Sequence, residues 1–208
     1  MAKVRSWVGL DVHARSVLAV SIDGESGELR TRKLSGATSE VVEFCCSLPG
    51  PTRAACEAGP TGYGLARAMH SAGVGCVVAA PGKIERPAAD KVKTDQRDAE
   101  RVLRLLMIDG LHAVRVPTGE EEALRDVVRA REAVRGDLMR ACQRLGKLLL
   151  RHDVHYEDPG SAWTIRHRSW LTSLDLGERG AQVTLLEYLG QVDAIVIRRD
   201  ALEKTIAE

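Results

Sequence analysis

The segment WVGLDVHARSVLAVSIDGESG, residues 7–27, decides the fold because it contains two apolar runs followed by a turn. Residues 7–12 and 17–22 are rich in β-branched and apolar side chains, which favour strands. The DGESG stretch at residues 23–27 is a strong turn signal, and residues 28–34 supply a third run. We therefore expect three consecutive antiparallel strands.

Helices and strands alternate after this meander. Ser39 is the expected N-cap of a short helix through Leu48, and residues 52–57 predict a strand that ends before a Gly-Pro turn. Residues 62–71 have helical spacing, and residues 76–80 form another apolar run.

The next helix is expected over residues 95–108, with Thr94 as its N-cap and an apolar stripe that would pack on the sheet. A meander followed by alternating helices and strands predicts a layered α/β core. We assign this core to a first domain, residues 1–117.

A long helical segment follows Pro117. Residues 120–150 contain no proline and repeat apolar side chains at roughly heptad spacing, and residues 185–206 resume a helical pattern. We expect an antiparallel, coiled-coil arm over residues 118–208. Its last helix carries no glycine or proline stop, which predicts that the arm is truncated at residue 208.

Composition excludes several classes of protein. The net charge is only +1, and no stretch is apolar and long enough to span a bilayer, so we expect a soluble, cytoplasmic protein without a membrane partner. The five cysteines show neither CxxC pairs nor zinc-finger spacing, which argues against disulfide or zinc frameworks.

Four acidic residues stand out as candidate metal ligands. Asp11 lies within an apolar strand and Glu57 at the end of another, where a carboxylate is costly to bury without compensation. Asp95 and Asp98 share one face of a helix start. Alone, the two aspartates could be acids favoured by the helix dipole, and Glu57 could cap a turn or form a salt bridge. Together, the four predict a cage for Mg²⁺ or Mn²⁺, the hard ions that prefer carboxylate oxygens.

Three sequence blocks carry a family resemblance: WVGLDVH at residues 7–13, ACEAGPTGYGLA at residues 55–66 and VKTDQRDA at residues 92–99. They resemble the signature blocks of the DEDD transposases, a bacterial insertion-sequence family. The resemblance implies an RNase H-like, RuvC-like mixed sheet flanked by helices. It also implies catalytic roles for Asp11, Glu57, Asp95 and Asp98, DNA cleavage or strand transfer, and guidance by a structured bridge RNA.

The resemblance covers nearly the whole chain, and the family's C-terminal domain, with its serine proposed to link to DNA, would follow residue 208. Ser161, Ser169 and Ser173 match no motif of that domain. We therefore expect recombination by this chain alone to be incomplete, and a homo-oligomer formed through the arm.

Several basic residues are candidate contacts to nucleic acid. Lys93 and Arg97 flank the paired aspartates and could touch phosphates. Arg140, Arg144, Lys147 and Arg151 share one helix face, although solvated helix flanks look similar. His13 could act near the metals, although the opposite face of the strand is its default direction.

Two other functions are open at this point. An actin-like or sugar-kinase ATPase half also places an aspartate on a first strand, but its phosphate loop needs small residues that positions 12–15 do not offer. A non-catalytic RNA-binding or dimerisation fragment would use the arm and retain the acids as remnants. That second alternative predicts no metal dependence.

Overall fold

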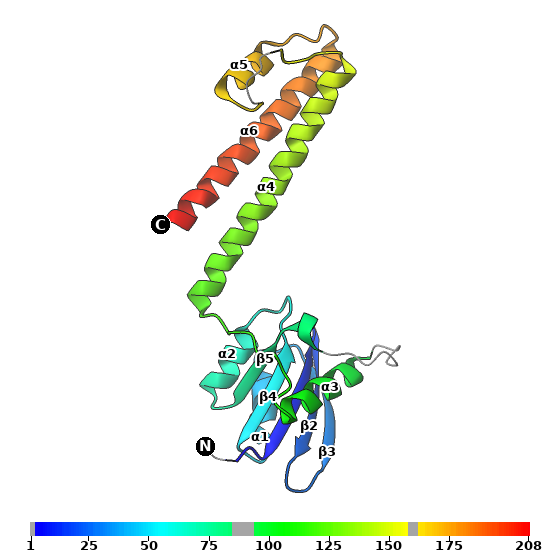
Figure 1. Ribbon diagram of the computed structural model, residues 1–208, viewed down its shortest axis with the longest axis vertical. Helices are drawn as coiled ribbons and strands as arrows, with labels where there is room; N and C mark the ends of the chain where they lie inside the picture. Colours follow the sequence, from blue (N-terminus) through cyan, green and yellow to red (C-terminus); the bar gives the residue numbers. More distant parts are fainter. Residues whose placement is uncertain (1–2, 85–93, 158–161) are drawn as a thin grey trace. The chain divides into compact units, whose positions relative to one another are not determined.

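The computed structural model describes residues 3–84, 94–157 and 162–208 (Figure 1). The chain divides into two compact units, Met1–Gly119 and Glu120–Glu208.

The first unit contains a five-stranded mixed sheet. Its strands are β1 (Ser6–Val12), β2 (Ser16–Asp23), β3 (Leu29–Ser35), β4 (Thr52–Glu57) and β5 (Gly75–Ala79). The spatial order is β3-β2-β1-β4-β5, with β1, β2 and β3 antiparallel and with β4 parallel to both β1 and β5. The predicted three-strand meander is therefore confirmed. The mixed sheet flanked by helices is consistent with an RNase H-like transposase fold.

Helices cover both faces of this sheet (Figure 1). On one face, α1 (Thr38–Ser47) and α2 (Gly64–Ser71) pack through Phe44 and Met69 onto a core that includes Val8 and Leu10 of β1. These helices connect β3 to β4 and β4 to β5, which lets β4 and β5 run parallel to β1.

The opposite face holds α3 (Asp95–Met107), which lies on β1, β2 and β4. Its buried residues Ala99, Val102, Leu103 and Leu106 form the predicted apolar stripe. The Thr94 hydroxyl accepts a hydrogen bond from the Arg97 amide, so the predicted N-cap is confirmed. A short 3-10 helix, η1 (Pro81–Lys83), follows β5.

One predicted cap is wrong. Helix α1 begins at Thr38, its N-cap is Ala37, and no side chain caps it, so Ser39 lies inside the first turn. The nearby Glu40 carboxylate instead accepts a hydrogen bond from the Ser35 amide, which ties the helix start to the end of β3.

Three helices make up the second unit: α4 (Gly119–Arg151), α5 (Ile165–Ser173) and α6 (Arg179–Ala207). A cluster of buried leucines joins all three: Leu145, Leu148, Leu149, Leu171, Leu185 and Leu189. The Arg131 guanidinium also contacts Glu203, and Arg144 donates to Gln191, so α4 and α6 run antiparallel. Helix α5, nine residues long, was not predicted.

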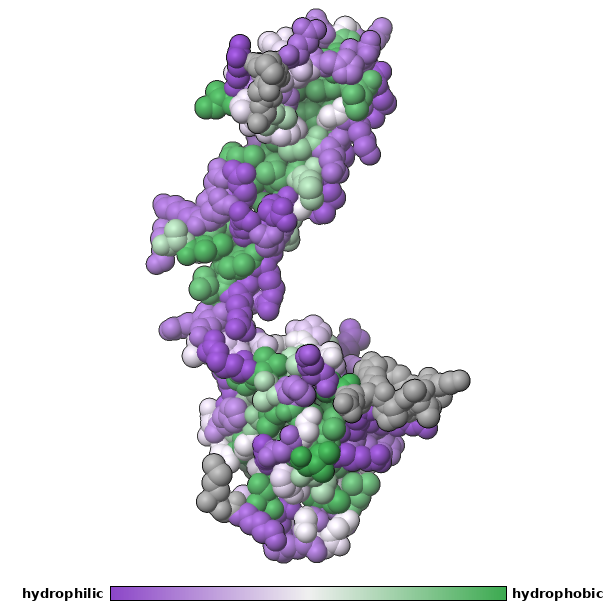
Figure 2. All heavy atoms as spheres, in the orientation of Figure 1, coloured by the Kyte–Doolittle hydropathy of each residue, from purple (hydrophilic) through white to green (hydrophobic). Residues whose placement is uncertain are grey.

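None of the described helices is long and apolar enough to cross a bilayer. Hydrophilic side chains recur over the visible face of both units (Figure 2).

Candidate metal centre

Strand register determines where Asp11 lies. Gly9 pairs with Val20, and Val20 packs with Ala99 and Leu103 of α3. Since side chains alternate along a strand, Asp11 projects from the same face of the sheet as Gly9, two residues further along. Asp11 therefore lies on the side of the sheet that carries α3, at the C-terminal end of β1.

Glu57 ends β4 on the same face. Its neighbour by alternation, Ala55, packs with Val102 and Leu106 of α3. The parallel register pairs Leu10 with Cys56, so Asp11 and Glu57 are the residues that follow the last pair of the β1–β4 ladder. Both acids thus stand where neighbouring parallel strands end at one edge of the sheet.

Asp11 and Asp95 form a three-residue group with His13. The imidazole Nε2 of His13 is 3.0 Å from Asp11 Oδ2 and 3.7 Å from Asp95 Oδ1. One ligand atom from each of the three residues lies within 4.8 Å of the others. Among the described residues, Glu57 and Asp98 are outside this group of atoms.

The prediction that His13 faces away from Asp11 is wrong. The two residues are two positions apart, so the alternation of a strand turns them to the same face. The histidine side chain is half exposed, whereas that of Asp11 is only 20% exposed. The signal was present in the sequence as the spacing DVH at residues 11–13.

Burial and neighbouring charges shape the chemistry of Asp11. Burial raises the pKa of its carboxyl group, and the negative charges of Asp95 and Asp98 raise it further, while the interaction with His13 opposes both. The carboxylates of Asp11, Asp95 and Asp98 therefore repel one another, and this repulsion favours a bound cation.

Asp98 lies one turn into α3 and is buried. Its Oδ1 accepts a hydrogen bond from the Arg101 guanidinium at 2.9 Å. This i,i+3 ion pair compensates for the burial of the carboxylate. The sequence reasoning did not identify Arg101, although its spacing from Asp98 is that of a helical neighbour.

The donor set fits a hard divalent ion. Carboxylate oxygens are the ligands that Mg²⁺ and Mn²⁺ prefer. Asp11 and Asp95 could hold such an ion, with Glu57 and Asp98 nearby and with His13 Nε2 hydrogen-bonded to Asp11. The N-terminus of α3 lies close to the acids, and its partial positive charge also favours negative groups there.

The predicted contacts to nucleic acid lie in different places. Lys93 is outside the described residues, and Arg97 is exposed in the first turn of α3. The remaining four cations are exposed on α4: Arg140, Arg144, Lys147 and Arg151. Arg140 pairs with Asp137 on the same helix, so part of its charge is compensated.

Comparisons with known proteins add a family match. Residues 8–153 match the model of a transposase family, DEDD_Tnp_IS110. That range includes the end of β1, the whole of α3 and α4, and all four predicted acids.

Two curated proteins are similar over most of the chain. The transposase for insertion sequence element IS1533 of Leptospira borgpetersenii is 35% identical over 99% of the chain. A protein of Sinorhizobium fredii, y4qE, is named as a transposase and is 36% identical over 91% of the chain. The aligned regions cover 61% and 50% of these relatives, so the chain spans little more than half of their length.

Proposed function

Because the chain belongs to the DEDD, IS110-type family of insertion-sequence transposases, we propose that its first unit cleaves or transfers phosphodiester bonds of DNA with divalent metal ions. The observation that supports this most is the meeting of Asp11, His13 and Asp95 at the sheet edge where Glu57 also ends. An isolated DxxD at a helix start would not need a partly buried strand aspartate beside it.

Each residue has a defined task in this proposal. Asp11, Glu57, Asp95 and Asp98 would hold Mg²⁺ or Mn²⁺, which when bound activates the attacking oxygen and stabilises the leaving oxygen. His13 orients the Asp11 carboxylate through Nε2. Arg101 orients Asp98 from the adjacent turn of α3. The close packing of Gly9 in β1 against Ala99 and Leu103 in α3 sets the distance between the strand and the helix.

The partners are proposed from the same family. DNA is the substrate and a structured bridge RNA the guide, and the exposed cations of α4 would contact nucleic-acid phosphates. The helical unit would join copies of the chain into a homo-oligomer, and the protein would act in the cytoplasm.

Metal binding to this chain can be measured by thermal melting. We expect saturating Mn²⁺ or Mg²⁺ to raise the melting temperature by several degrees, because a ligand at about 100 times its Kd stabilises the native state by about 2.7 kcal/mol. Asp11→Asn should remove the shift. Burial and neighbouring charges raise the pKa of Asp11, so the neutral amide should leave the metal-free protein at least as stable.

Glu43→Gln is the matched control, because Glu43 is exposed on α1, which lies on the opposite face of the sheet. This variant should keep the full metal-induced shift. If neither ion raises the melting temperature of the unmodified chain, the acids are remnants and the non-catalytic reading is favoured.

A further inference from the structure

A row of paired residues crosses the sheet from β3 to the acid group. Lys33 pairs with Leu18 of β2, and Leu18 pairs with Asp11 of β1. Directly opposed residues on neighbouring strands project from the same face. Lys33 is thus two strand spacings, about 10 Å, from Asp11 on the α3 side of the sheet.

Neighbouring side chains independently support this orientation of Lys33. Leu34 is buried in the core beneath α1 and α2, and the Arg32 guanidinium lies 5.7 Å from the centre of the Phe44 ring of α1. Lys33 stands between these two residues in β3. Strand alternation therefore turns it away from α1, toward the face that carries α3.

The surface around Lys33 is open and polar. Thr31, Lys33 and Ser35 are all exposed in β3, whereas α3 lies on β1, β2 and β4. Two residues further along β3, Ser35 pairs with Ser16 and its hydroxyl donates to Glu40 of α1. The Ser16 carbonyl accepts a hydrogen bond from the His13 amide. We call Thr31, Lys33, Ser35 and Ser16 the β3 shelf.

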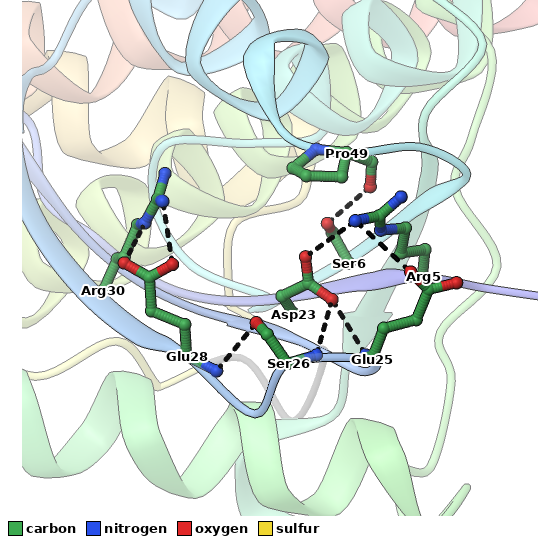
Figure 3. A network of polar contacts seen from close by, with 8 residues as sticks. All are labelled: Arg5, Ser6, Asp23, Glu25, Ser26, Glu28, Arg30 and Pro49. Carbon is green, nitrogen blue, oxygen red and sulfur yellow. Dashed lines mark hydrogen bonds and ion pairs between the residues drawn. The ribbon is translucent and has the colours of Figure 1, made fainter.

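The charge of Lys33 is not compensated by an ion pair within the described part of the chain. Several arginines of this unit do form ion pairs. Arg5 pairs with Asp23 and Arg30 with Glu28, as Figure 3 shows, and Arg53 pairs with Asp109. Lys33, like Arg15 in the turn before β2, makes no ion pair with any described carboxylate. An uncompensated cation beside a group of acids complements a polyanion that must approach those acids.

We propose that the β3 shelf binds the sugar-phosphate backbone of a single DNA strand and leads it to the acid group, with Lys33 contacting a phosphate. This inference rests on the proposed nuclease function, because a strand must reach the carboxylates despite their repulsion. Lys33 is a positioning residue. The exposed hydroxyl of Thr31 is a further donor to phosphate on the same face.

The test is binding of a fluorescent single-stranded DNA of about 20 nucleotides to the whole chain, measured by anisotropy in EDTA over a range of salt concentrations. Loss of one phosphate contact lowers the slope of log K against log salt by about 0.7 for a single strand. We expect this loss for Lys33→Ala, and retention of the slope in Lys33→Arg. Arg30→Ala is the matched control, because it removes one charge from the same strand on the opposite face.

Equal slopes for Lys33→Ala and Arg30→Ala, with unchanged melting temperatures, would overturn the proposal. An unmodified chain that does not bind the strand, or a Lys33 effect seen only with RNA of the same sequence, would overturn it too. If Lys33 is only a charge that protects an edge strand from pairing, its replacement leaves the slope unaltered. The metal-induced melting shift is measured in parallel, so failure of the shelf and failure of the metal centre are distinguished.

Discussion

Asp98 and Arg101 illustrate how individual side chains prepare the site. Asp98 is 7% exposed, and a carboxylate this buried needs a compensating group. Arg101 supplies one from the next turn of the same helix at 2.9 Å. His13, the residue directly after β1, contributes similarly to Asp11. The acids are therefore held by neighbours from their own elements, a short distance away in the sequence.

Replacing Arg101 should destabilise the first unit. We expect Arg101→Ala to lower the free energy of unfolding by about 1 to 3 kcal/mol, because a buried carboxylate loses a charged hydrogen bond. Arg104→Ala removes an exposed arginine from the same helix and should change stability by no more than about 0.5 kcal/mol. Urea titrations followed by circular dichroism compare the two, and equal effects would argue against a structural role for the Asp98–Arg101 pair.

Helix α3 and strand β1 approach so closely that only glycine fits between them. A Cβ atom at Gly9 would lie 2.1 Å from the Ala99 carbonyl oxygen and 2.6 Å from the Leu103 nitrogen. Both atoms belong to backbone, so neither can turn aside. This approach brings the first turn of α3 to the end of β1, where Asp95 and Asp11 meet.

Gly9→Ala therefore tests whether the site depends on element packing. The methyl group should push α3 from the sheet, lower stability by about 1 to 3 kcal/mol and abolish the metal-induced melting shift, although every acid is retained. Gly75→Ala is the control, since a Cβ at Gly75 would meet only the Arg53 side chain, at 3.8 Å. A Gly9→Ala protein with a normal metal response would contradict the close-packing argument.

The chain as a whole combines two units of different character. The first carries the acids on a mixed sheet, and the second is a set of helices whose leucine cluster joins α4, α5 and α6. Exposed cations on α4 provide a surface with charge suited to phosphates. The proposed division of labour assigns the reaction to the first unit and part of the nucleic-acid binding to the second.

Copurified RNA provides the test of the guide proposal. We expect sequencing to recover one structured, element-encoded RNA, and a several-fold loss of that RNA in the double variant Arg144→Gln/Lys147→Gln. The double variant Arg129→Gln/Arg135→Gln removes the same charge from residues that pair with Asp126 and Glu132, and should retain the RNA. Absence of an enriched RNA, or equal loss in both variants, would count against guidance through α4.

Local patterns in the chain were sufficient to predict most elements. Strand ends at Val12 and Glu57 and the N-cap at Thr94 agree with the structure, because alternation, turn residues and capping act over a few neighbouring residues. The prediction of Ser39 as the N-cap of α1 was wrong, because a helix can also begin without a side-chain cap. Helix α5, which is only nine residues long, was not predicted.

By itself, the sequence determined which carboxylates are costly to bury and which runs become strands or helices, because both properties depend on adjacent residues. Only the tertiary structure decided that Asp95 of α3 meets Asp11 and His13, and that Lys33 of β3 stands in line with Asp11. Those relations depend on strand register and on the approach of α3 to Gly9, which couple residues far apart in the chain.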